Sequence, residues 1–363
     1  MSDTKINNRF TEIDIVRGCA IILMIFGHTD LVFNALVYGG EGLGGVMREV
    51  TDTYSFLARF FRTPTVIMFF GISGVALGVN AYMHTQHGNK HARLLSRVLP
   101  LLILQLSLVS LAWNLLFPAD TFHLYIGIFA TYAGVFLVMH FLRYFSWNIL
   151  GIAGVVLLLL REYFSHWVTS DGIISSFVVS YLWQPSVGTS ISFYYPLLSW
   201  LAVVMIGYGL GYVYAMLRER RVSVVPYIVY FSCLCILAAI GLRLLHVGNL
   251  GFNDWASWYE FISLRKYPPS LIFVLWGFGI TALYGLFALS LSRHYLGRAV
   301  ALIGRHSMGL YVLHLFIIYL LSLLIPRDFG GYLVVVTTAL VTIITTCACY
   351  CAALGITYWK RTR

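Results

Sequence analysis

Long apolar runs recur along the whole chain, and they limit it to a structure that surrounds them with lipid or with protein. They occupy residues 15–37, 64–82, 98–117, 123–142, 147–160, 190–217, 223–243, 269–292, 301–325 and 332–358. A helix needs about 20 such residues to cross a bilayer, and only the run at 147–160 is clearly short. Charged residues make up 10% of the 363 residues, against roughly 25% in soluble domains. The sequence therefore predicts an all-α integral membrane protein of about ten transmembrane helices.

The runs follow one another without a soluble linker or an internal repeat, so we expect a single polytopic domain over residues 1–363. Residues 1–13 are polar and lack a cleavage signal, which predicts an uncleaved first helix. With the N-terminus inside, most Lys and Arg residues lie on the cytoplasmic side, as the positive-inside rule requires. We therefore expect both termini, including the tail at 359–363, to be cytoplasmic. Residues 171–183 are expected to form a short re-entrant or interfacial helix.

The sequence gives no support for a metal site, a disulfide framework or a nucleic-acid partner. The six cysteines lie within apolar runs, and those at 347, 349 and 351 point in different directions on a helix because residues two apart are about 200° apart. We expect no metal site and no disulfide framework. The basic residues are divided among short turns and form no patch, so no nucleic-acid partner is expected.

The first apolar run contains two ionisable residues on one face. Arg17 and His28 are eleven residues apart, which at about 100° per residue returns to nearly the same angle. A charge inside a span costs at least about 2.5–3.5 kcal/mol, so both should face a protein interior or a wet cavity. Asp14 can pair with Arg17. Either these residues are a helix-end ion pair and a core imidazole, or they are an anion-binding Arg and a deeper general base.

Further polar groups lie at the ends of later runs. Lys266 and Tyr267 precede two prolines, and Tyr195 precedes one. Lys266 either anchors the helix at the interface or orients an acceptor and stabilises an oxyanion. The predicted catalytic set is His28, Arg17 and Lys266. Ser307, Tyr311 and His314 share one helix face, which suits a cavity or interhelical hydrogen bonds. The predicted acceptor or cavity residues are Asp14, Asp30, Tyr195, Tyr267, Ser307, Tyr311 and His314.

Several motifs resemble known families. An Arg and a His separated by ten residues on the first helix is the motif of the membrane-bound acyltransferase-three family. The longer string RFTEIDIVRGCAIILMIFGH, at 9–28, resembles the start of the heparan-α-glucosaminide N-acetyltransferase-like family. Other segments similar to that family follow in order and extend over most of the chain: FRTPTVIMFFGISGVALG (61–78), YPLLSWLAVVMIGYGLG (195–211), KYPPSLIFVLWGFG (266–279) and GRHSMGLYVLHLF (304–316).

The resemblance implies a transmembrane acyltransferase fold and transfer of an acetyl group across the bilayer. Acetyl-CoA would enter from the cytoplasm as co-substrate, with no permanently bound cofactor. The expected acceptor is a sugar hydroxyl or amine of an extracytoplasmic carbohydrate or glycolipid. The lysosomal branch has Asn at the position of His28 and its catalytic His after that helix. No His occurs here between His28 and His84, so we assign the base to His28, which acts in direct attack on acetyl-CoA or through an acetyl-His intermediate.

The resemblance also gives the basic residues at the cytoplasmic helix ends a role. Arg93, Arg97, Arg305 and His306 are expected to bind the CoA phosphates, although a role as topology determinants explains them equally well. A bacterial inner membrane is the expected location, and the oligomeric state stays open. The alternative function is a transporter or channel that uses Arg17 and His28 as a substrate or proton path. Against it, no pair of interrupted helices is apparent.

Overall fold

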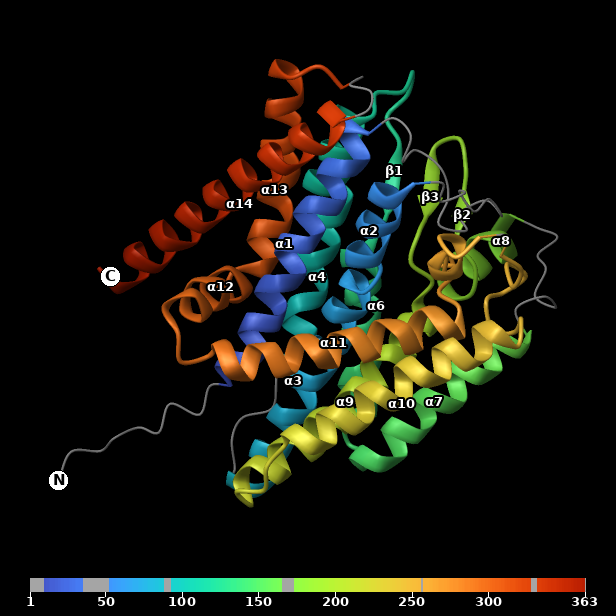
Figure 1. Ribbon diagram of the computed structural model, residues 1–363, viewed down its shortest axis with the longest axis vertical. Helices are drawn as coiled ribbons and strands as arrows, with labels where there is room; N and C mark the ends of the chain where they lie inside the picture. Colours follow the sequence, from blue (N-terminus) through green and yellow to red (C-terminus); the bar gives the residue numbers. More distant parts are fainter. Residues whose placement is uncertain are drawn as a thin grey trace.

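The computed structural model describes residues 10–34, 52–87, 93–164, 173–255, 257–327 and 332–362. In these parts of the chain nine helices are long and apolar enough to span a membrane, and α6 is a shorter apolar helix. Together they match the ten predicted runs, which confirms an all-α integral membrane protein (Figure 1). The helices are α1 (Thr11–Phe33), α2 (Thr53–Arg62), α3 (Thr65–His87), α4 (Leu95–Leu104), α5 (Ser110–Leu116), α6 (Ile128–Leu142), α7 (Trp147–Phe164), α8 (Ile173–Leu182), α9 (Leu197–Glu219), α10 (Val225–Leu244), α11 (Leu271–Leu291), α12 (Tyr295–Arg305), α13 (Ser307–Leu324) and α14 (Tyr332–Arg361).

Some of the predicted runs begin or divide differently in the structure. The run at 301–325 is divided, because α12 ends at Arg305 and α13 begins at Ser307 after a change of direction at His306. The run at 190–217 becomes helical only at Leu197, since strands form immediately before it. The short helix expected at 171–183 is α8.

The helix α1 lies at the centre of one helix group and packs against α3, α11, α12, α13 and α14. Its contact with α12 is very close. A Cβ atom on Gly18 would lie 2.1 Å from the Val300 carbonyl oxygen, and one on Gly304 would also clash with the α1 backbone. In Figure 1, α10 and α11 run side by side at a large angle to α1.

The helices α3 and α9 are joined through glycines on both of them. A Cβ atom on Gly78 would lie 2.0 Å from the Tyr208 carbonyl oxygen, and one on Gly211 would lie 2.1 Å from the Val75 carbonyl oxygen. Small residues let membrane helices approach closely, so that backbone and side-chain packing replaces the hydrophobic effect as the driving force. This contact fixes α3, whose first turns form one wall of the functional site.

We expect Gly211→Ala to lower the thermal unfolding midpoint of the detergent-purified protein, because the added methyl group meets backbone that cannot move aside. Overpacking of this kind typically costs about 1–3 kcal/mol. The matched control is Gly285→Ala on α11, where a Cβ atom meets nothing within 4 Å. Fluorescence-detected size-exclusion after heating measures both variants. Equal midpoints for the two would show that the α3–α9 contact tolerates a side chain.

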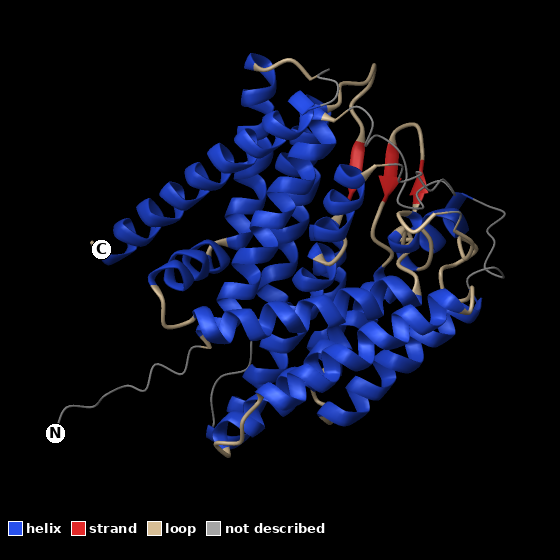
Figure 2. Ribbon diagram, in the orientation of Figure 1, coloured by secondary structure: helices blue, strands red, loops and turns tan. Residues whose placement is uncertain are grey.

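A small sheet stands at one end of the helices (Figure 2). Strand β1 (Leu124–Ile126) pairs in parallel with β3 (Ile191–Phe193), and β2 (Ser186–Val187) pairs antiparallel with β3. The sheet follows a π-helical segment, η3 (Gln105–Val109), through α5. The fully buried Gln105 donates to the Tyr125 carbonyl oxygen at 2.8 Å and accepts from the Phe129 amide at 3.0 Å. Gln105 thus ties the first strand to the start of α6.

Candidate active site

A cavity of about 360 Å³ opens between α1, α2, α3, α13, the π-helical segment η3 with α5, and the sheet. This volume lies within the usual range of small-molecule sites, about 300–1,000 Å³. The lining is mainly apolar and aromatic, with a few polar and cationic groups. The lining residues are Met24, Gly27, His28, Leu31, Arg62, Thr65, Val66, Phe69, Gln105, Val109, Trp113, Phe117, Tyr125, Gly127, Ile128, Tyr194, Tyr195, Lys266, Tyr267 and Tyr311.

His28 is half-buried on α1 and forms part of the cavity wall. Its Nδ1 lies 2.8 Å from Nε2 of His314, a fully buried residue on α13. Trp113 and Tyr311 present their rings edge-to-face to the imidazole, with centroids 5.1 Å and 6.3 Å away. The structure therefore brings together three of the residues predicted from the sequence, His28, Tyr311 and His314, and holds the His28 ring on three sides.

A cation that the sequence reasoning did not assign to the site lies beside His28. Arg62, at the end of α2, lines the cavity, and its side chain crosses Gly27, where a Cβ atom would lie 3.0 Å from it. Arg62 forms an ion pair with the buried Asp30 at 3.4 Å. Tyr54 also donates to Asp30, at 2.7 Å. Asp30 thus positions Arg62 at the cavity instead of facing the cavity itself.

Lys266 and Tyr267 form the part of the cavity wall that comes from the α10–α11 connection. The Lys266 ammonium lies 4.9 Å from the centroid of the Tyr267 ring. The hydroxyl of Tyr267 is 3.1 Å from that of Tyr195, so the two predicted tyrosines are hydrogen-bonded partners in the same wall. Tyr125 on β1 and Tyr194, directly after β3, stack with centroids 6.0 Å apart. The cavity therefore combines two cations with several tyrosines.

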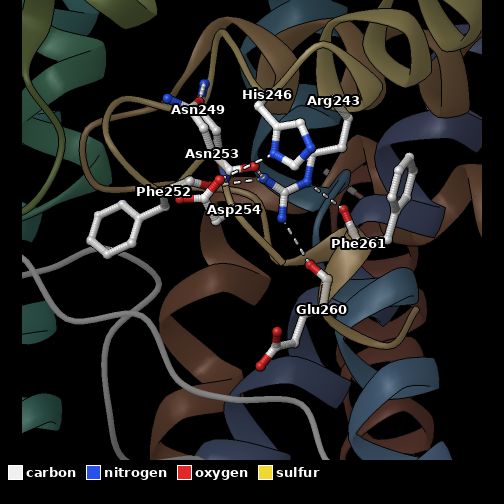
Figure 3. Close-up of polar contacts among 8 residues, drawn as sticks. All are labelled: Arg243, His246, Asn249, Phe252, Asn253, Asp254, Glu260 and Phe261. Atoms are coloured by element: carbon white, nitrogen blue, oxygen red, sulfur yellow. Dashed lines mark hydrogen bonds and ion pairs between the residues drawn. The ribbon is translucent and has the colours of Figure 1, made fainter. Parts of the chain in front are cut away.

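The α10–α11 connection keeps its shape because a buried arginine holds its backbone. Arg243 is 2% exposed and donates to the carbonyl oxygens of Phe252, Asn253, Glu260 and Phe261, at 2.8–3.1 Å (Figure 3). Non-helical backbone carries carbonyl groups that need hydrogen-bond donors when buried. One guanidinium has five N–H donors in a fixed fork, which suits this task.

A second set of contacts joins this connection to the helices around it. Asn249 accepts from the Arg265 amide at 2.8 Å and from the Ser270 hydroxyl at 3.0 Å. From α7, Arg161 donates to the Pro269 carbonyl oxygen at 2.8 Å. These contacts fix the residues on both sides of Lys266 and Tyr267. Arg161 and Arg243 thus serve to hold backbone.

We expect Arg243→Met to loosen this connection, because four carbonyl oxygens lose the guanidinium donor, although those of Phe252 and Glu260 still accept from Asn249 and from the Ser263 amide. Each hydrogen bond to a charged group contributes about 1.5–3 kcal/mol. Hydrogen exchange of the 245–266 backbone should rise markedly, and the thermal midpoint should fall. Arg293→Met, at an exposed position, is the control and should leave both unchanged. Unaltered exchange in Arg243→Met would contradict the role given to this guanidinium.

Arg17 lies apart from the cavity, in an ion-pair cluster at the other end of α1. Asp14 is buried and lies 3.7 Å from the Arg17 guanidinium and 3.4 Å from that of Arg305. Arg17 is not among the cavity-lining residues. Between Arg17 and His28 on the same face lie Ile21 and Met24, both buried. These apolar side chains separate the Arg17 cluster from His28 on this face, and Met24 itself lines the cavity.

The remaining predicted residues are spread along the same end of the protein. Arg93 and Arg97 are exposed at and near the start of α4. His306 lies 3.0 Å from the hydroxyl of Thr357 on α14. Ser307, the first residue of α13, is not part of the cavity wall. Residues 35–51 and 165–172 lie outside the described residues.

Several cavity residues were not found from the sequence. Arg62 comes from α2, whereas Gln105 and Trp113 come from the run at 98–117; Tyr125 lies on β1 and Tyr194 directly follows β3, within runs that the sequence presents as apolar. Gln105 gave a weak signal, as one of several polar residues in the mainly apolar run at 98–117. A π-helical segment at that position is a feature often found at functional sites.

The fold and the cavity define a polytopic α-helical membrane protein with a histidine-containing site within its bundle, and a family comparison identifies its class. The sequence model of the family described as heparan-alpha-glucosaminide N-acetyltransferase, catalytic, matches residues 9–247. The chain belongs to this family, a class of membrane acetyltransferases. The matched region includes Arg17, His28 and Arg62, whereas Lys266 and His314 lie beyond it. A comparison with curated proteins found no match.

Proposed function

We propose that this protein transfers an acetyl group from cytoplasmic acetyl-CoA to a sugar hydroxyl or amine on the extracytoplasmic side. The observation that carries the proposal is the placement of His28 on the wall of a cavity that also contains Lys266 and Arg62. A base and cations around one apolar space are the groups that acyl transfer from a thioester requires. Membership of the acetyltransferase family supports the same reaction.

In the proposed reaction His28 accepts the proton of the acceptor O–H or N–H as that atom attacks the thioester carbonyl. A C–O or C–N bond forms, the C–S bond breaks, and His28 returns the proton to the CoA thiolate. Lys266 and Arg62 face the same cavity and stabilise the negative charge that develops on the carbonyl oxygen. The reaction needs no oxidant or reductant.

The cavity walls favour a polyhydroxylated acceptor. The Tyr195–Tyr267 hydroxyl pair and the Tyr125 and Tyr194 rings offer hydrogen bonds and flat surfaces close to His28. Such mixed groups suit a sugar, which has hydroxyls at its rim and C–H groups on its faces. The volume of about 360 Å³ suits one sugar residue and the reacting acetyl group better than a long chain.

The donor is proposed to bind at the opposite end of α1. Arg17 and Arg305 converge on Asp14 there, and Arg93 and Arg97 are exposed at and near the start of α4. Guanidinium groups bind phosphates in bidentate fashion, and CoA carries three phosphoryl groups. Ile21 and Met24 lie on the α1 face between the two ends, so the pantetheine arm passes them as it brings the thioester to His28.

The first test compares wild type, His28→Asn and Cys19→Ala in nanodiscs with radiolabelled acetyl-CoA and a methyl α-glucosaminide as acceptor. We expect loss of the base to lower kcat by about 10²–10⁴-fold, with acetyl-CoA binding retained. Cys19 is half-buried on the same helix and does not line the cavity, so Cys19→Ala should keep its activity. Full turnover by His28→Asn would refute the base assignment. Absence of CoA binding in wild type would favour a transporter.

The second test addresses the donor end. The double variant Arg93→Gln/Arg97→Gln should raise KM for acetyl-CoA several-fold with kcat little changed, because exposed ion pairs contribute roughly 1 kcal/mol or less each. Added salt should reduce the difference from wild type. Arg220→Gln, exposed at the end of α9, is the control. A fall in kcat at constant KM would place these arginines outside the donor site.

A further inference from the structure

The two histidines of the site meet in a geometry that fixes where their protons lie. The planes of His28 and His314 differ by 15°, and the ring centroids are 5.1 Å apart while the two nitrogens are 2.8 Å apart. These values describe two rings lying end to end along the nitrogen–nitrogen line, not face to face. The lone pair of an imidazole nitrogen lies in the ring plane, so this arrangement is that of a direct hydrogen bond.

The other nitrogen of His314 determines the direction of that bond. Nδ1 of His314 lies 3.1 Å from the carbonyl oxygen of Leu310, one turn earlier on α13. A carbonyl oxygen can only accept, so Nδ1 of His314 bears a proton. In neutral His314 the remaining nitrogen, Nε2, then has a lone pair and accepts from Nδ1–H of His28.

We propose that His314 is a positioning residue that sets the tautomer of His28. The chain of contacts from the Leu310 carbonyl through His314 places the His28 proton on Nδ1 and leaves Nε2 with the lone pair. His314 is fully buried, whereas His28 is half-buried and reaches the cavity. The lone pair is therefore on the nitrogen that does not bond to His314, which is the one available to an acceptor in the cavity.

This inference rests on the proposed function for its catalytic meaning, since it states which nitrogen takes the proton of the acceptor. Nε2 of His28 accepts that proton as the new C–O or C–N bond forms, and later donates it to the leaving thiolate. Throughout, Nδ1–H remains bonded to His314, which also disperses the charge of the transient imidazolium. In serine proteases a buried carboxylate holds the catalytic histidine in the correct tautomer. In this protein the neutral imidazole of His314, itself hydrogen-bonded to the Leu310 carbonyl oxygen, has that role.

The groups around His28 are compatible with this assignment. Arg62 on α2 and Lys266 on the α10–α11 connection are the charged groups that act on it, and both are cations without an acceptor for Nδ1–H. Trp113 on α5 and Tyr311 on α13 present ring edges to the imidazole and restrict its rotation. Among the described residues His314 is thus the partner that defines the tautomer.

The direct test uses ¹⁵N NMR of histidine-labelled protein in detergent micelles, which reports the protonated nitrogen of each neutral imidazole. Comparison with His28→Asn assigns the His28 signals. We expect wild-type His28 to have its proton on Nδ1 and His314→Leu to shift it to Nε2, the tautomer that free histidine prefers. Wild-type His28 protonated on Nε2 would overturn the proposal, and so would an unchanged spectrum in folded His314→Leu.

Kinetics supply the second readout. His314→Leu removes the acceptor and should lower kcat at least about tenfold with KM little changed. His314→Gln offers a carbonyl oxygen near the position of Nε2 and should restore much of the rate and the Nδ1–H signal. If both variants lose activity equally while their size-exclusion profiles match wild type, His314 does not act through an accepted hydrogen bond. A correct tautomer in a protein that transfers no acetyl group would instead refute the proposed function alone.

Discussion

Hydrocarbon supplies no hydrogen bonds, so the polar and charged side chains within this helical bundle depend on partners inside the protein. The described residues show several such arrangements along α1, and three of them bear on the site. Asp14 lies between two arginines at one end, the two site histidines meet near the other, and Asp30 accepts from Tyr54 and pairs with Arg62. Each joins α1 to a different element. The hydrogen bonds and ion pairs that satisfy these groups within the membrane therefore also determine how the site is assembled.

The same need explains why a non-helical segment can form one wall of the cavity. The α10–α11 connection contains turns, a short 3₁₀ helix and exposed carbonyl groups, and the arginine side chains of α7 and α10 satisfy many of them. Irregular backbone at such positions is tolerated where protein surrounds it. Rigid support of this kind is what an acyl-transfer site needs, because the rate depends on holding the reacting atoms close and aligned.

Much of the fold follows from patterns within single segments, and much of the site does not. Apolar run length located the spanning helices, and the spacing of Arg17 and His28 placed both on one face of α1. The helix-face argument also grouped Tyr311 with His314. However, the partner of His28 lies 286 positions away, and the Arg62 side chain passes closely over Gly27 on its way to the cavity. Contacts of this type depend on how helices cross, which local periodicity does not specify. The division at His306 escaped prediction because the predicted run continues through the polar residues Arg305, His306 and Ser307, which mark it.

The buried pair Ile21 and Met24, which separates the two polar ends of α1, has a consequence for the membrane itself. A continuous wet channel from one surface to the other would let protons and small ions leak through and dissipate the gradients that a cell maintains across its membrane. Two apolar side chains, Ile21 and Met24, interrupt the polar groups on this helix face between the two clusters. An apolar stretch of this kind opposes such a leak while polar groups are held at both ends of the helix.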